Sequence, residues 1–163
     1  MTCHCPHVED AAVIDMTAPY PLFRTLRDIK RRGNPWWWLG LSVCQECRQG
    51  WLVASEEAQN DVYCLLRLTK EQVTGIVEQE QWPTDFDRYE VLLEMGRAAG
   101  HAVRFGKGND SPLIDTVKLL AEQRPGISVR ELARLLNLTV AEAERIAQKV
   151  VNTARVSIQF VGS

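Results

Sequence analysis

Two pairs of cysteines constrain this chain more than any other feature of its sequence. Cys3 and Cys5 lie near the start, and Cys44 and Cys47 follow after an intervening stretch of 38 residues. A Cys-x2-Cys turn lets two thiolates reach one tetrahedral ion, and two such clusters supply the four ligands of a closed zinc site. Because a loop of this length closes at modest entropic cost, the two pairs can meet in the folded chain. The sequence therefore predicts a structural zinc ion as cofactor.

The first half of this predicted site leaves the ligand set open. His4 and His7 flank the first cysteine pair, so Cys-x-Cys, Cys-x-His and His-x2-His pairings are all available. We expect Cys3 or Cys5 to bind the metal with a second ligand from the same cluster, and His7 is the favoured histidine. The candidate ligands are Cys3, Cys5, His7, Cys44 and Cys47. Two unrelated groups of reduced cysteines, or a redox-active Cys-x2-Cys pair, are the alternatives.

The cellular compartment bears on how these thiols are used. The first residues have neither the basic region nor the apolar core of a signal peptide. No apolar run approaches the roughly 20 residues of a membrane span, so we expect a cytoplasmic protein with no membrane partner. In that reducing compartment thiols bind metals more often than they form disulfides. The fifth cysteine, Cys64, lies in an apolar run and is expected to be a buried strand residue.

The residues around Cys44 and Cys47 predict a small antiparallel sheet pinned by zinc. Apolar runs at residues 36–43, 51–54 and 62–68 are typical of strands, and residues 55–61 form a polar turn. A helix is predicted before them, over residues 21–32, from apolar positions 22, 23, 26 and 29. Adjacent strand residues point to opposite faces, so Trp36, Trp37 and Trp38 do not share one face. The sequence leaves three alternative roles for these tryptophans, namely packing in the core, stacking on a ligand and anchoring a protein interface.

Helix signals dominate the rest of the chain. Thr69 is predicted to cap a helix over residues 70–79. A second helix is predicted to begin near Thr84 or Asp85 and to end between Gly96 and Gly100. Residues 100–112 contain three glycines and a proline, which indicates a connector. Further helices are predicted over residues 111–123, 128–136 and 139–150, with a terminal strand over residues 155–161.

Residues 128–146 resemble a helix-turn-helix. Ser128 with Glu131, and Thr139 with Glu142, form two capping boxes. Asn137 takes the turn position that glycine usually holds, because asparagine tolerates the left-handed conformation. The resemblance implies a compact helical module that either packs against protein or binds DNA.

DNA binding by this module is the less favoured interpretation. In a DNA-reading member the second helix enters the major groove, and Arg145 and Lys149 are the candidate DNA-binding residues. The first turn of that helix also carries Glu142 and Glu144, and the phosphates of DNA repel their carboxylates. Residues 101–163 hold nine basic and six acidic residues, which is a thin basic footprint for a DNA-binding surface.

The net charge of −2 conceals an acidic first part. Residues 1–100 hold 10 Lys and Arg against 15 Asp and Glu, and most of the carboxylates lie between residues 56 and 94. A solvated helix face and a docking surface for a basic protein are the two interpretations. The candidate partner-binding residues are Glu78, Glu80, Asp85, Asp87 and Glu90.

These signals together predict an α+β protein of two domains. Residues 1–105 form a zinc-ribbon-like antiparallel meander with helices, and residues 106–163 form the helix-turn-helix-like helical module. No Ser-His-Asp constellation, phosphate-binding glycine loop or zinc-protease helix motif occurs in the sequence, so no catalytic residue is assigned and a non-enzymatic protein is expected.

The layout of residues 1–105 resembles the immunity proteins made beside bacterial polymorphic toxins. The residues that carry the resemblance are Cys44-x2-Cys47, the strand at residues 51–54, residues 60–63 and the segment at residues 82–90. It implies a non-enzymatic inhibitor that covers the active site of a cognate, basic toxin domain. The alternative is a zinc-stabilised transcription regulator that binds DNA.

Overall fold

The computed structural model describes residues 2–33, 37–101 and 110–160, and the chain forms two compact units, Met1–Asp87 and Arg88–Ser163. The first unit contains η1 (Cys5–His7), β1 (Ala11–Asp15), η2 (Pro21–Arg24), β2 (Leu26–Gly33), β3 (Trp37–Cys44), β4 (Gly50–Glu56), β5 (Val62–Leu68) and α1 (Lys70–Gln79). The second contains α2 (Tyr89–Ala98), α3 (Ser111–Gln123), β6 (Ile127–Ser128), α4 (Val129–Leu135), α5 (Val140–Thr153) and β7 (Ile158–Gln159). The predicted α+β class is confirmed.

The predicted division after residue 105 and the observed units differ in where they place α2. This helix belongs to the second unit, where it lies against α3 and α4. Trp36 and residues 102–109 of the predicted connector lie outside the described residues.

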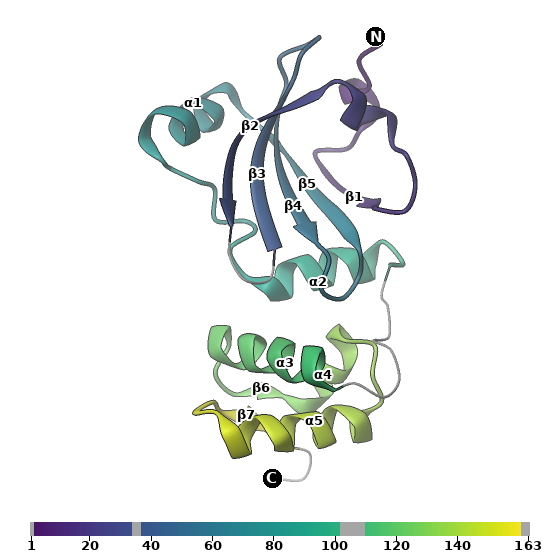
Figure 1. Ribbon diagram of the computed structural model, residues 1–163, viewed down its shortest axis with the longest axis vertical. Helices are drawn as coiled ribbons and strands as arrows, with labels where there is room; N and C mark the ends of the chain where they lie inside the picture. Colours follow the sequence, from purple (N-terminus) through teal and green to yellow (C-terminus); the bar gives the residue numbers. More distant parts are fainter. Residues whose placement is uncertain (1, 34–36, 102–109, 161–163) are drawn as a thin grey trace. The chain divides into compact units, whose positions relative to one another are not determined.

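The first unit is built on one antiparallel sheet of five strands, in the order β1-β5-β4-β3-β2 (Figure 1). Strands β2 to β5 form a meander, and β1 adds to the free side of β5. The three strands predicted around the cysteine pair are therefore confirmed as β3, β4 and β5. Strands β1 and β2 were not predicted, and they form the two edges of the sheet.

One face of the sheet packs against α1. Along β3 the side chains of Trp37, Leu39 and Leu41 are buried on this face. A side chain at Gly50 would meet Val73 of α1, because a Cβ atom there would overlap Cγ2 of that valine. Glycine on β4 therefore allows the helix to approach the sheet closely. The predicted cap of this helix is confirmed, since Thr69 forms a complete capping box with Gln72.

The opposite face is covered over only part of its area. The segment before β2 packs a small apolar cluster onto it, formed by Cys5, Val8, Ile14, Leu22, Cys44, Trp51 and Leu65. At the border of this cluster the rings of Phe23 and Tyr63 lie 4.8 Å apart. Beyond that pair the sheet face is open, and Trp38 of β3 projects there with 55% of its surface exposed.

The predicted helix over residues 21–32 is wrong. Only Pro21–Arg24 forms a short 3-10 helix, and the remainder is the edge strand β2. The pairing of β2 with β3 shifts between Asp28 and Lys30, so Ile29 is the extra residue of a β-bulge. Because of the bulge and the exposure of this edge, apolar and polar residues do not alternate along β2 as they do in a half-buried strand. The apolar residues at positions 22, 23, 26 and 29 happen to follow the spacing of a helix. Gly33 followed by Asn34 and Pro35 is the sequence signal that could have indicated a hairpin.

In the part of the second unit that the structure describes, four helices pack around a leucine-rich core. Its buried side chains include Leu113, Val117, Leu120, Leu132, Leu135, Ile146 and Val150. Ser128 accepts the backbone N–H of Glu131, and Thr139 forms a complete capping box with Glu142. Asn137 adopts the predicted left-handed conformation with φ of 54°. The terminal strand is shorter than predicted, and β7 pairs in parallel with β6.

Candidate metal centre

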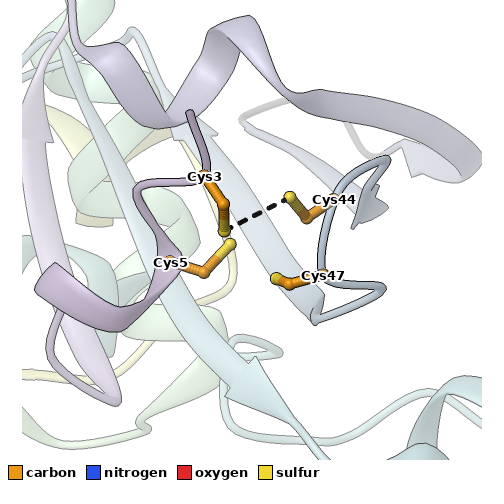
Figure 2. A group of neighbouring side chains, drawn as sticks. All are labelled: Cys3, Cys5, Cys44 and Cys47. Atoms are coloured by element: carbon orange, nitrogen blue, oxygen red, sulfur yellow. Dashed lines mark hydrogen bonds between the residues drawn. The ribbon is translucent and has the colours of Figure 1, made fainter. Parts of the chain in front are cut away.

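Four cysteine sulfurs converge between the N-terminal segment and the turn that joins β3 to β4. The Sγ atoms of Cys3, Cys5, Cys44 and Cys47 all lie within 4.8 Å of one another (Figure 2). Those of Cys3 and Cys44 are 3.8 Å apart. Zinc–sulfur bonds of about 2.3 Å in a tetrahedron separate two sulfurs by about 3.8 Å, whereas a disulfide needs about 2.05 Å. All five cysteines are free thiols, and the cluster is compatible with a four-thiolate metal site.

The local backbone prepares Cys44 to act as an anionic ligand. This residue ends β3, and burial alone would favour its neutral thiol. The backbone N–H groups of Cys47 and Glu46 and the hydroxyl of Thr25 hydrogen-bond to its sulfur, and together they lower the pKa of Cys44 to about 6. The Thr25 oxygen lies 3.4 Å from that sulfur. Hydrogen bonds that favour a thiolate are the outer-shell support expected around a metal ligand.

Cys5 is one of the two buried cysteines of the cluster. Burial raises the pKa of its thiol, while the indole N–H of Trp51 acts in the opposite direction from 3.4 Å. Because an indole nitrogen only donates, the sulfur of Cys5 is the acceptor. The pKa of Cys3 is raised, first by the neighbouring Cys47 side chain and then by burial. Thiols packed this closely keep some of their protons unless a cation replaces them.

Arg67 of β5 holds the N-terminal segment against the sheet. Its guanidinium lies 4.4 Å above the ring of Trp51 and donates to the carbonyl oxygens of Cys5 at 2.8 Å and Val8 at 2.7 Å. Its Nε atom also pairs with Asp10 at 2.8 Å. No sequence pattern indicates this role of Arg67, because its partners are backbone atoms about 60 residues away along the chain.

The structure brings both cysteines of the first pair into the cluster and leaves out His7. Cys5 to His7 is a single 3-10 turn with three residues per turn, so positions 5 and 7 face different directions. Cys5 faces the buried cluster, and the imidazole of His7 is exposed. The four-sulfur set provides no open coordination position, which suits a structural ion rather than a catalytic one. Cys64 lies apart, buried in β5 as predicted, where burial and the charge of Glu56 raise its pKa to about 12.

The predicted partner-binding carboxylates divide into paired and unpaired groups. Glu80 pairs with Lys30, and Asp87 pairs with Arg32 of the edge strand β2. Glu90, in the second unit, is only 17% exposed and pairs with Arg88 and Arg124. Among the described residues, Glu78 and Asp85 have no ion-pair partner, and both are exposed.

The two candidate DNA-binding residues share one carboxylate. Arg145 and Lys149 of α5 both bind Asp110, with the lysine Nζ 2.6 Å from a carboxylate oxygen. Hydrogen bonds from Arg145 and then Lys149 lower the pKa of Asp110 to about 2. The positive charge of this helix face is therefore partly neutralised within its own unit.

A groove on the open face of the sheet is the feature that the sequence did not specify. Its volume is about 600 Å³, and Trp38, Phe23, Leu26, Val53 and Tyr63 supply its apolar walls. Its polar lining includes Asp28, Arg31, Ser55 and Glu57. Asp28 accepts from Ser42 at 2.8 Å, and the Arg31 guanidinium lowers the pKa of Asp28. Trp37 faces the opposite side and is buried, so alternation along β3 alone decides which of these two tryptophans is available.

No protein-family model, curated protein or solved structure matches this chain. None of the helices in residues 2–33, 37–101 and 110–160 has both the length and the apolar character needed to cross a membrane.

Proposed function

We propose that the protein is a non-enzymatic, protein-binding inhibitor whose first unit folds around a structural zinc ion. The observation that carries this proposal is Trp38, which is 55% exposed over an open groove of about 600 Å³. Tryptophan is among the residues most enriched at the energetic centres of protein interfaces, and a polar rim around an apolar centre is the usual anatomy there. Asp28, Arg31 and Glu57 provide that rim.

The specific role that we propose is that of an immunity protein that neutralises a basic bacterial toxin in the cytoplasm. Glu57 lines the groove as an exposed carboxylate, and Glu78 and Asp85 are further exposed carboxylates without an ion pair in the described part of the chain. Unpaired carboxylates attract a basic partner and speed its association. Glu80, Asp87 and Glu90 contribute less to this attraction, because arginine or lysine side chains already bind them.

Co-expression with a toxin tests this role, and the product of the adjacent gene is the first toxin to test. The protein should restore growth, and Trp38→Ala should abolish the rescue by weakening binding about a hundredfold. Tyr20→Ala is the matched control, since Tyr20 is an exposed aromatic residue outside the groove. Reversal of Glu78 and Asp85 to lysine should slow association. A protein that neither binds this product nor restores growth contradicts the inhibitor role.

Zinc is the metal that the donor set favours. Four thiolates at tetrahedral spacing select zinc or an iron–sulfur centre, and a closed set of four is typical of structural zinc. Native mass spectrometry of the purified chain should show one zinc ion per molecule. A metal-free protein that keeps its folded spectrum would refute this assignment.

The alternative function is DNA binding by the second unit. Asn137 has a left-handed backbone conformation between α4 and α5, and a capping residue precedes each of these helices. Both features support the interpretation of this segment as helix-turn-helix-like. This alternative predicts salt-dependent binding to duplex DNA that weakens in Arg145→Ala and Lys149→Ala. An absence of binding at low salt argues against it.

A further inference from the structure

A second groove lies on the other face of the sheet, between the edge strand β2 and α1. Its volume is about 530 Å³. Its apolar lining consists of Ile29 from β2, Val43 from β3, and Val73 and Val77 from α1. Ile29 and Val77 are 47% and 46% exposed, respectively, so two large aliphatic side chains face solvent in one place. An occupant of the groove gains free energy by burying these two aliphatic side chains.

The polar lining of this groove is positively charged. Arg27 and Arg48 line it together with the amide side chain of Gln45. Arg27 lies directly opposite Val43 in the β2–β3 pairing, so both side chains point to the same face. Arg48 comes from the turn between β3 and β4, where its φ is 65°.

Arg27 and Arg48 differ from the remaining cations of β2 in having no carboxylate partner in the described part of the chain. Lys30, Arg31 and Arg32 each pair with a carboxylate of the first unit, respectively Glu80, Asp28 and Asp87. The guanidinium groups of Arg27 and Arg48 have no such partner among the residues that the structure describes. The unit therefore balances the charge along β2 everywhere except beside the aliphatic patch. An occupant that complements this groove has to bring both carboxylates and an aliphatic side chain.

We propose that the β2–α1 groove binds a segment of a partner protein in which acidic residues flank an aliphatic one. The aliphatic side chain covers Ile29 and Val77, and the carboxylates pair with Arg27 and Arg48 in charge-assisted hydrogen bonds. This site is distinct from the groove around Trp38, which lies on the opposite face of the sheet, and it does not depend on the inhibitor role.

The cysteine cluster holds one side of this groove in place. Gln45 lies between Cys44 and Cys47, and Arg48 follows directly. The Arg48 N–H donates to the Cys44 carbonyl at 3.0 Å, and the Gln45 N–H donates to the Thr25 carbonyl at 2.8 Å. A metal on the four sulfurs fixes the turn that presents Arg48, whereas Arg27 is held by the sheet alone. Substitutions at Arg48 and at Arg27 therefore test different parts of the site.

Selection from a displayed library of random short peptides, against the full-length protein, tests the proposal. The enriched peptides should combine aspartate or glutamate with leucine, isoleucine or valine. Fluorescence anisotropy with the best peptide should show a loss of about tenfold or more in affinity for Arg27→Glu and for Arg48→Glu. Val77→Ser should weaken binding as well, and added salt should weaken it progressively.

The matched control is Arg24→Glu, which makes the same charge change at an exposed arginine of the first unit outside the groove. It should leave the peptide affinity unchanged. Tryptophan fluorescence of each variant checks that the first unit keeps its fold, because all five tryptophans lie within residues 36–82. Every substituted side chain lies at the surface. Enrichment of peptides without acidic residues, or an affinity insensitive to Arg27→Glu, overturns the proposal. Arginine-dependent binding of a duplex oligonucleotide in place of peptides overturns it too, since it assigns the groove to phosphate.

Discussion

The first unit brings residues 3–5 and 44–47 together at one end of an open sheet, whereas the second unit closes four helices around a continuous core without a cysteine. The N-terminal segment of the first unit contributes four buried residues to its apolar cluster, Cys5, Val8, Ile14 and Leu22. Small hydrophobic cores usually need a metal or a disulfide for stability. The second unit has leucine-rich helices with capping residues at α4 and α5 instead.

This contrast teaches that the two units respond to different perturbations. All five tryptophans lie within residues 36–82, so tryptophan fluorescence reports on the first unit alone. Far-UV circular dichroism is dominated by helices, most of which belong to the second unit.

Loss of one sulfur ligand should have the largest effect. Cys44→Ser removes a ligand and the hydrogen bonds that its sulfur accepts, and structural zinc contributes on the order of 10 kcal/mol to folding. We expect the full-length variant to lose zinc in native mass spectrometry and to lose the fluorescence transition of the first unit. NMR signals of the second unit should persist. Cys64→Ala is the matched control, because this cysteine is outside the cluster; an unchanged fluorescence transition in Cys44→Ser would show that the metal is not structural.

Arg67→Ala should have the next largest effect. The variant loses charge-assisted hydrogen bonds to the carbonyls of Cys5 and Val8 and the contact with the Trp51 ring, so we expect the first unit to lose about 3 kcal/mol. Urea unfolding followed by fluorescence measures this loss. Asp10→Asn is the control: Asp10 is highly exposed, and its surface ion pair with Arg67 is worth about 1 kcal/mol or less. Equal losses in the two variants would contradict the role assigned to Arg67.

The two complete capping boxes offer a matched pair, one in each unit. Thr69→Ala and Thr139→Ala each remove the side-chain acceptor of a helix N-terminus, and each should cost about 1 kcal/mol. Only Thr69→Ala should shift the fluorescence midpoint, and Thr139→Ala should shift the circular dichroism midpoint instead. Thr74→Ala, at an exposed position inside α1, should leave both nearly unchanged. A fluorescence shift in Thr139→Ala would show that the two units unfold together.

The pH dependence of the second unit should show the smallest effect. Arg145 and Lys149 lower the pKa of Asp110 from 3.8 to about 2 in the folded chain. A lowered pKa means that the folded state binds fewer protons than the unfolded state between these values. The contribution is therefore fully present above about pH 4 and is lost as the pH falls towards 2. The wild type should lose more stability than Asp110→Asn over this interval, measured by circular dichroism, and parallel losses would contradict the pairing.

The sequence by itself determined the elements whose signals are local. Capping residues at Thr69, Ser128 and Thr139 fixed the starts of three helices, because a cap depends only on residues within one turn. Apolar runs predicted the positions of β3, β4 and β5, and the spacing of the two cysteine pairs predicted that they come together in the folded chain. The two edge strands could not be predicted from the sequence, because β1 is short and β2 is largely exposed with a bulge at Ile29.

Tertiary structure decided which residues of each candidate set take part in the site. The direction of one 3-10 turn selects Cys5 over His7, and strand alternation exposes Trp38 while burying Trp37. Lys30 and Arg32 neutralise two of the predicted acidic residues, whereas Arg27 and Arg48 keep their charge beside an aliphatic groove. These outcomes depend on which side chains distant segments bring within a few ångströms of one another. Local propensities and spacing carry no such information, because charge pairing and burial are properties of the folded chain.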